Sequence, residues 1–241
     1  MMYERYFIME YVNTYYLGIY SLALKVGMIA QIIMHSILSG WEPYLISNLN
    51  NKNINRNLNL MLKITIFASL FLAFFLNLIG EYIILFLGNE NYLEAKYYIL
   101  PISLGVIFQE LYRIPLSGII ESKKAHVFTV IQFMCFFILV LTLFMLKDLI
   151  DLKIIVLVIS FVYFFRFFSL SFISNYISKL KLNILDLILI LNIYIILFLV
   201  IYHFDVFNFN EFLKFTMMLI LSGITLTFFI NLSEIKIIKK V

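Results

Sequence analysis

The sequence predicts an all-α, polytopic membrane protein, a transmembrane helical bundle of about seven spans, each needing roughly 20 apolar residues. Of its 241 residues, 63% are hydrophobic and 13% charged, and the mean hydropathy is +1.01. A soluble domain is about half apolar and a quarter charged, so a soluble enzyme, a nucleic-acid-binding domain and a secreted disulfide scaffold are excluded. The apolar residues also form long runs without the alternation typical of a membrane β-barrel.

Cysteine usage limits the chemistry further. Cys135 is the single cysteine, so neither an intrachain disulfide nor a thiolate zinc site can form. We expect no cofactor, no metal and no enzymatic activity, because the sequence has no Walker loop, no GxGxxG and no HExxH.

Residues 1–16 have no clean apolar core, because Glu4, Arg5 and Glu10 interrupt them. A cleavable signal peptide is therefore not predicted, and the segment is interpreted as an extracytoplasmic loop or the end of a helix. The first predicted span covers residues 17–46. Pro43 is expected to kink it near its end, because proline removes a backbone donor.

The second and third predicted spans contain helix-disturbing residues. The second covers residues 60–87, and its Gly80-Glu81 pair predicts that the membrane helix ends at about residue 79, before a short interfacial piece. The third covers residues 95–119, with Pro101 in its early turns and Pro115 near its end.

Four further apolar runs complete a bundle that is predicted to occupy residues 17–232. These spans cover residues 126–146, 154–177, 184–203 and 211–232, and a basic tail of residues 233–241 follows.

The connecting loops alternate in charge, which gives the predicted orientation. One side carries nine basic residues: Lys52, Arg56, Lys123, Lys124, Lys179, Lys181, Lys236, Lys239 and Lys240. The other side carries mainly acids, among them Glu4, Glu10, Glu90, Glu94, Asp148, Asp151, Asp205 and Glu211. Because basic loops stay in the cytoplasm, the N-terminus is predicted outside and the C-terminus inside.

A few charged residues fall within the predicted spans, where charge is costly and usually functional. Glu110 and Arg113 are three residues apart, so they either form an intrahelical ion pair or face a lumen. Arg166 has no acid within one turn, and either faces the lumen or reaches an interface; Lys25 leaves the same two alternatives open. Glu42, beside Pro43, is an interfacial or functional acid.

Polar neighbours complete the candidate set. Gln31 and Gln109 lie within the spans, and His35 is interpreted as a hydrogen-bonding residue between helices in preference to a proton relay. Three basic groups against one or two acids predict a weakly cationic interior, which suits an anionic substrate such as a phosphate-linked lipid.

Several motifs follow one another in a family-like order. Glu4-Arg5 precede an aromatic stretch and then LGIYSLALK at residues 17–25; GWEPYL follows at 40–45, and NYLEAKYYILPISLGVIFQELY at 91–112. This pattern resembles the oligosaccharide flippase family, the O-antigen and polysaccharide-export branch of a superfamily that includes multidrug and toxin exporters. The resemblance covers residues 4 to about 180. Glu110 departs from it, because the family usually has a small residue there.

The resemblance implies a fold of twelve or fourteen helices in two similar bundles, of which this chain corresponds to the C-terminal half. It also implies transport of an undecaprenyl-pyrophosphate-linked oligosaccharide across the bacterial cytoplasmic membrane by alternating access. Lys25, Arg113, Arg166 and Gln109 then become candidate substrate-binding residues. Glu110 and Glu42 become candidate ion-coupling residues. The expected partners are the lipid-linked oligosaccharide, membrane lipids, a separate N-terminal half and polysaccharide assembly proteins.

Three other functions stay open. A multidrug or toxin exporter would favour acidic residues in the lumen for cationic drugs. A membrane-embedded polysaccharide polymerase would need a large external loop, whereas the predicted external loops are short. An inactive truncated product is the remaining alternative.

Overall fold

The computed structural model describes residues 2–49, 51–147, 151–183 and 186. This part of the chain is helical and contains no β-strand. Its elements are α1 (Met2–Tyr11), α2 (Thr14–Ser47), α3 (Ile54–Leu87), the 3-10 helix η1 (Glu90–Ala95), α4 (Lys96–Leu111), α5 (Arg113–Glu121), α6 (Ala125–Met145) and α7 (Leu152–Ile177). The predicted spans at 184–203 and 211–232 and the tail at 233–241 lie outside the described residues.

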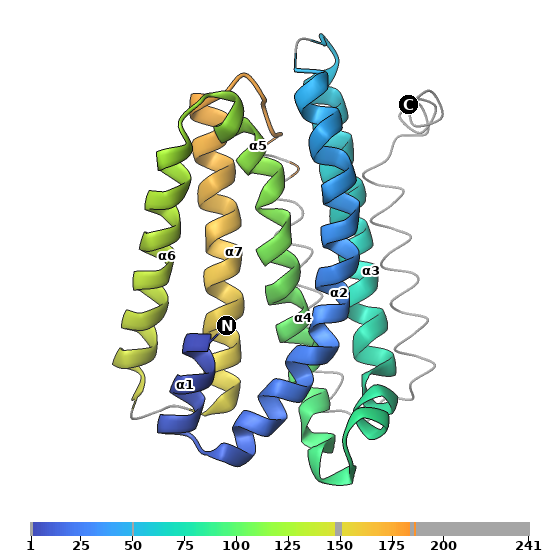
Figure 1. The fold of residues 1–241 in the computed structure, drawn as a ribbon, viewed down its shortest axis with the longest axis vertical. Coiled ribbons are helices and arrows are strands. Elements are labelled where there is room, and N and C mark those ends of the chain that lie inside the picture. The colour runs from blue at the N-terminus through green and yellow to red at the C-terminus, as the bar shows by residue number, and fades with distance from the viewer. Residues whose placement is uncertain (1, 50, 148–150, 184–185, 187–241) are drawn as a thin grey trace.

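Five helical segments are long and apolar enough to cross a membrane: α2, α3, Glu90–Glu121 taken as one unit, α6 and α7. They stand side by side and alternate in direction (Figure 1). The all-α prediction is therefore confirmed for the described residues, and the first five predicted spans correspond to these segments. The count of seven spans and the relation to one half of a flippase stay predictions.

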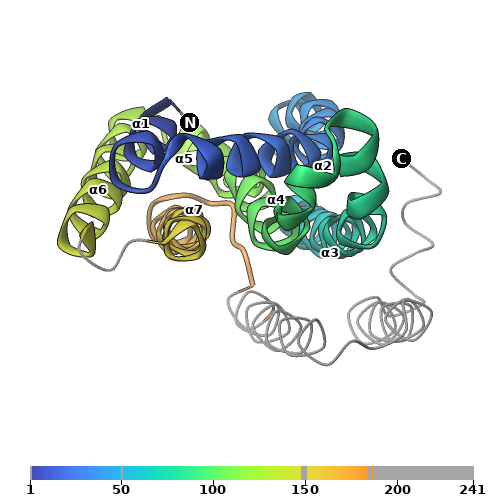
Figure 2. The ribbon, with the colours of Figure 1, turned by 90° about the horizontal axis from the view of Figure 1, so that it is seen from below.

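Helix α4 lies at the centre of the described bundle. It packs against α2, α3 and α7 (Figure 2), and the stretch from Tyr98 to Phe108 is entirely buried. Because α4 and α5 together form the third span, any side chain at their junction is held between neighbouring helices. The residues of this span therefore determine which side chains lie in the centre of the bundle at mid-membrane depth.

The N-terminal segment was expected to be a loop, and that expectation is wrong for Met2–Tyr11, which form α1. Its Glu4 is 2% exposed and accepts hydrogen bonds from the hydroxyls of Tyr20 and Tyr163, both at 3.1 Å. These two bonds tie α1 to α2 and α7. The alternative interpretation of the segment, the end of a helix, agrees with this geometry.

Helix α3 runs without interruption to Leu87, so the predicted end at about residue 79 is wrong. A Cβ at Gly80 would overlap the side chain of Ile99 on α4. Gly80 therefore provides close packing between two helices, as small residues do in membrane proteins, and does not end the helix.

The third span, predicted as one helix, is broken at Tyr112, where α4 ends and α5 begins. Pro115 explains the break, because it has no N–H for the carbonyl of Leu111 and its ring clashes with that carbonyl. Pro43 acts differently, since α2 continues through it to Ser47. The bend of α2 that Figure 1 shows lies in its first half.

At one end of the bundle, side chains at the start of α3 hydrogen-bond to the segment that follows α7. The Asn55 side chain accepts from the backbone N–H of Lys181 at 3.0 Å, and Asn59 accepts from that of Asn183 at 2.7 Å. The turn after α2, the turn after α5 and the segment after α7 thus share one end (Figure 1). Its basic residues are Lys52, Arg56, Lys123, Lys124, Lys179 and Lys181.

Cysteine labelling tests the orientation that this charge distribution predicts. In a Cys135→Ser background, Ser47→Cys and Asn183→Cys are expected to react with a membrane-impermeant maleimide only after the cells are permeabilised. Asn89→Cys, in the turn before η1 at the opposite end, is expected to react in intact cells and serves as the positive control. Labelling of Ser47→Cys or Asn183→Cys from outside would reverse the orientation.

Candidate functional site

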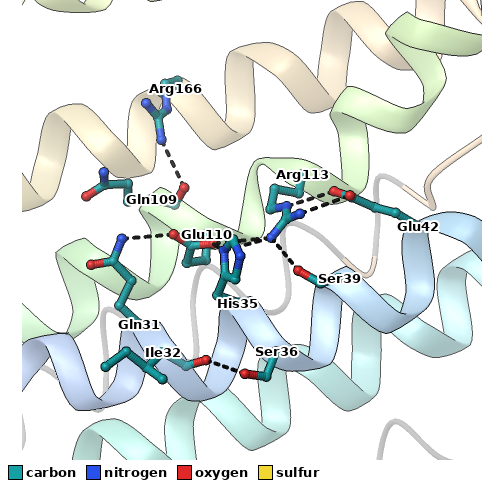
Figure 3. A network of polar contacts seen from close by, with 10 residues as sticks. All are labelled: Gln31, Ile32, His35, Ser36, Ser39, Glu42, Gln109, Glu110, Arg113 and Arg166. Atoms are coloured by element: carbon teal, nitrogen blue, oxygen red, sulfur yellow. Dashed lines mark hydrogen bonds and ion pairs between the residues drawn. The ribbon is translucent and has the colours of Figure 1, made fainter.

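An ion network joins α2 to the junction of α4 and α5 (Figure 3). Glu110 lies in the last turn of α4, and Arg113 is the first residue of α5. Residues three or four apart share one face of a helix, so α2 offers a polar stripe toward this junction. The stripe consists of Gln31, His35, Ser39 and Glu42.

Arg113 binds Glu42 on α2 through two parallel hydrogen bonds. Its Nε lies 2.7 Å from Oε1 of Glu42, and its Nη2 lies 2.9 Å from Oε2. This fork-to-fork geometry gives the strongest type of charge-assisted pair. The predicted intrahelical partner, Glu110, is farther away, with its Oε2 at 3.7 Å from Nη1. The principal ion pair of Arg113 therefore connects two spans.

Glu110 is held by two α2 side chains. Gln31 Nε2 donates to its Oε1 at 2.9 Å, and His35 Nδ1 lies 3.1 Å from its Oε2. The carboxylate side chain is only 9% exposed, whereas the side chain of His35 is 60% exposed. The interpretation of His35 as a residue that hydrogen-bonds between helices is confirmed by these contacts. No helix of the described part covers the outer side of this imidazole.

The network lies well inside the span. Glu110 precedes the end of α5 at Glu121 by eleven residues, which is about 16 Å along a helix axis. That depth is about half of a hydrocarbon core of roughly 30 Å. Two carboxylates and one guanidinium at this depth are costly to place in lipid, so their exposed side requires water or polar groups.

Arg166 belongs to a second, buried cluster between α4, α6 and α7. It is 4% exposed and donates to the Gln132 side chain and the Gln109 backbone carbonyl, both at 3.0 Å. Its guanidinium also lies 4.4 Å from the centre of the Tyr112 ring, within the range of a cation–π interaction. Arg166 thus stabilises a C-terminal carbonyl of α4 beside the break, where helix dipoles favour positive charge.

Lys25 stands apart from both clusters. It is exposed on α2, ten residues before His35 and so about 15 Å away along the axis. The predicted site residues therefore fall into three groups: Glu42 with Glu110 and Arg113, Arg166 with Gln109, and Lys25 alone.

The weakly cationic interior, which counts Lys25, Arg113 and Arg166 against Glu42 and Glu110, stays a prediction. The network by itself contains two acids and one base, because Glu42 and Glu110 both approach Arg113. Gln31 was already a polar candidate from the sequence, whereas Ser39 was missed. The signal for Ser39 was present, since Gln31, His35 and Ser39 recur every four residues before Glu42.

The described residues contain no group of three or more His, Cys, Asp or Glu side chains that could hold a metal ion. The site is thus a network of ion pairs and amides within a helical bundle. Comparison of the chain with protein-family models, with curated proteins and with solved structures found no match.

Proposed function

We propose that this chain forms part of a membrane transporter that moves an undecaprenyl-pyrophosphate-linked oligosaccharide across the cytoplasmic membrane by alternating access. The observation that carries the proposal is the charged network at mid-membrane depth, whose His35 side is open in the described bundle. Ionisable groups at such depth line substrate or ion pathways far more often than they contact lipid. The motif pattern at residues 4–25, 40–45 and 91–112 supports the oligosaccharide as cargo.

The transport path runs along the exposed face of α2, between this bundle and a second helical bundle. The polar head group crosses beside the network, while the lipid tail stays in the bilayer. Lys25 is the cation best placed for the pyrophosphate, because it is exposed and makes no ion pair within the described residues. Arg113 is held by Glu42, and Arg166 is buried, so both act mainly by positioning the broken span.

A second candidate function is the export of cationic compounds, as in multidrug and toxin exporters. One observation favours it: Glu42 and Glu110 together exceed the single positive charge of Arg113. A cation could bind to this excess charge on the open side of the network.

Complementation of a strain that lacks the gene tests the oligosaccharide proposal. We expect Lys25→Ala to reduce surface polysaccharide several-fold at an unchanged membrane level of the protein, because the phosphate loses its exposed cation. Lys52→Ala, an exposed loop lysine, is the matched control and should retain wild-type polymer. Unchanged polymer in Lys25→Ala would contradict the role of Lys25. A wild-type chain that restores resistance to cationic dyes but not surface polymer would favour the second candidate.

A further inference from the structure

One ring nitrogen of His35 lies within hydrogen-bond distance of two groups, of which one always donates a hydrogen and the other, when ionised, only accepts one. Nδ1 is 2.9 Å from Nη1 of Arg113 and 3.1 Å from Oε2 of Glu110. Arginine is always a donor, so Nδ1 can accept its hydrogen only while Nδ1 itself carries none. An ionised carboxylate only accepts, so the contact with Glu110 requires a hydrogen on Nδ1 or on Glu110. While Glu110 is ionised, the two contacts cannot both be satisfied in one protonation state of His35.

The charges around His35 do not balance without a proton. Glu42 on α2 and Glu110 on α4 contribute two negative charges, and Arg113 on α5 contributes one positive charge. With a neutral imidazole the network carries one net negative charge, which is costly away from water. One added proton on the pair of His35 and Glu110 makes the network neutral.

Other charged groups near α2 are engaged elsewhere. Glu4 of α1 binds Tyr20 and Tyr163, and Lys63 of α3 pairs with Asp186 at 3.3 Å. The charged residues of η1 lie at the opposite end of the bundle, and Arg166 contacts the α7 side of α4. The only other charge on this stretch of α2 is Lys25, about 15 Å from His35 along the axis.

We infer that His35 and Glu110 form a binding site for one proton, and that this proton selects the partner of Arg113. With the proton bound, Nδ1–H donates to Glu110, and Nη1 of Arg113 keeps Ser39, at 3.2 Å, as its acceptor. Without it, Nδ1 accepts from Nη1, and the contact with Glu110 is lost. The proton comes from and returns to water at the exposed side of the imidazole. This inference is independent of what the protein transports.

The site acts on the break in the third span. Glu110 and Arg113 lie on opposite sides of Tyr112. Binding of the proton therefore moves the hydrogen bond of His35 on α2 from Arg113 on α5 to Glu110 on α4. A proton bound here therefore changes how tightly α2 holds each half of the broken span.

Nitrogen-15 NMR of histidine-labelled protein in lipid nanodiscs tests the inference on the full chain. The chain has three histidines, and His35→Gln identifies the His35 signals. We expect Nδ1 of His35 to carry a hydrogen at low pH and to be an unprotonated acceptor at high pH. A neutral ring that keeps its hydrogen on Nδ1 at high pH would overturn the inference.

Glu110→Gln adds a quantitative test, because it removes the carboxylate that stabilises the proton. In this variant we expect Nδ1 of His35 to stay the acceptor of Arg113 under conditions in which the wild-type Nδ1 carries its hydrogen. The matched control is Glu81→Gln, whose carboxylate pairs with Lys96 at 3.2 Å outside the network and should leave His35 unchanged. Equal proton affinity of His35 in wild type and Glu110→Gln would overturn the inference.

Discussion

Arg113→Leu is expected to lower the free energy of unfolding by about 3 kcal/mol, since breaking a buried ion pair typically costs about 3–5 kcal/mol. The substitution leaves the carboxylates of Glu42 and Glu110 without their shared cation inside the span. The low end of the range applies because the side chain of Glu42 is 36% exposed, and water can solvate part of its charge. Equilibrium unfolding in mixed micelles, followed by the fluorescence of Trp41, the single tryptophan, measures the change.

A double-mutant cycle separates the ion pair from the packing of the side chain. Adding Glu42→Gln to Arg113→Leu removes one stranded charge, so the double variant should be less destabilised than the sum of the two single changes, by about 1 kcal/mol or more. Arg56→Leu is the matched control, because this exposed arginine of α3 should change stability by no more than about 0.5 kcal/mol. Equal effects of Arg113→Leu and Arg56→Leu would show that the Glu42 pair does not stabilise the bundle.

Gly118→Val is expected to be the most damaging small-to-large change, at about 3 kcal/mol, the upper part of the usual range for overpacking. A Cβ at Gly118 of α5 would overlap Oγ of Ser174 on α7 and lie 2.7 Å from Oγ of Ser178, the residue that follows α7. Ser178 cannot turn away easily, because its hydroxyl donates to backbone carbonyls of Ser174 and Leu180, each at 2.8 Å. The added side chain must therefore push α5 from α7.

Gly40→Val provides the matched control in the same assay. Gly40 also lies within a helix, so both changes alter helix propensity alike, but a Cβ at Gly40 meets no atom within 4 Å. We expect Gly40→Val to keep nearly the wild-type unfolding transition. If the two valine variants unfolded alike, the close approach of α5 to α7 would not matter for stability.

The sequence predicted the helical spans of the described part because burial in lipid leaves a direct composition signal. Runs of about 20 apolar residues are visible without knowing any contact, and the loop charges need only counting. The local effects of glycine and proline were harder to predict. Gly80 was expected to end a helix and instead permits close packing against Ile99, whereas Pro115 breaks the third span at Tyr112. One-dimensional patterns cannot distinguish a breaker from a packing position.

The candidate site was predicted in part for the same reason. Charged residues inside apolar runs stand out, so Glu42, Glu110, Arg113 and Arg166 could be selected from the sequence alone. Their partners could not be selected, because an ion pair between residues 71 positions apart depends on how α2 packs on α5. Spacing favoured Glu110 as the partner of Arg113, but the fork of Arg113 reaches Glu42.

The sequence by itself therefore determined which of the described residues form membrane-type helices, which loops carry basic charge, and which charges fall within apolar runs. Only the tertiary structure decided that Arg166 is buried beside the Gln109 carbonyl and that Arg113 joins α2 to α5. It also decided that His35 and Glu110 meet, at 3.1 Å, on the open side of the network. The physical reason is range: hydrophobicity acts through each residue's own contact with solvent or lipid, whereas hydrogen bonds and ion pairs require side chains from different helices within about 3 Å.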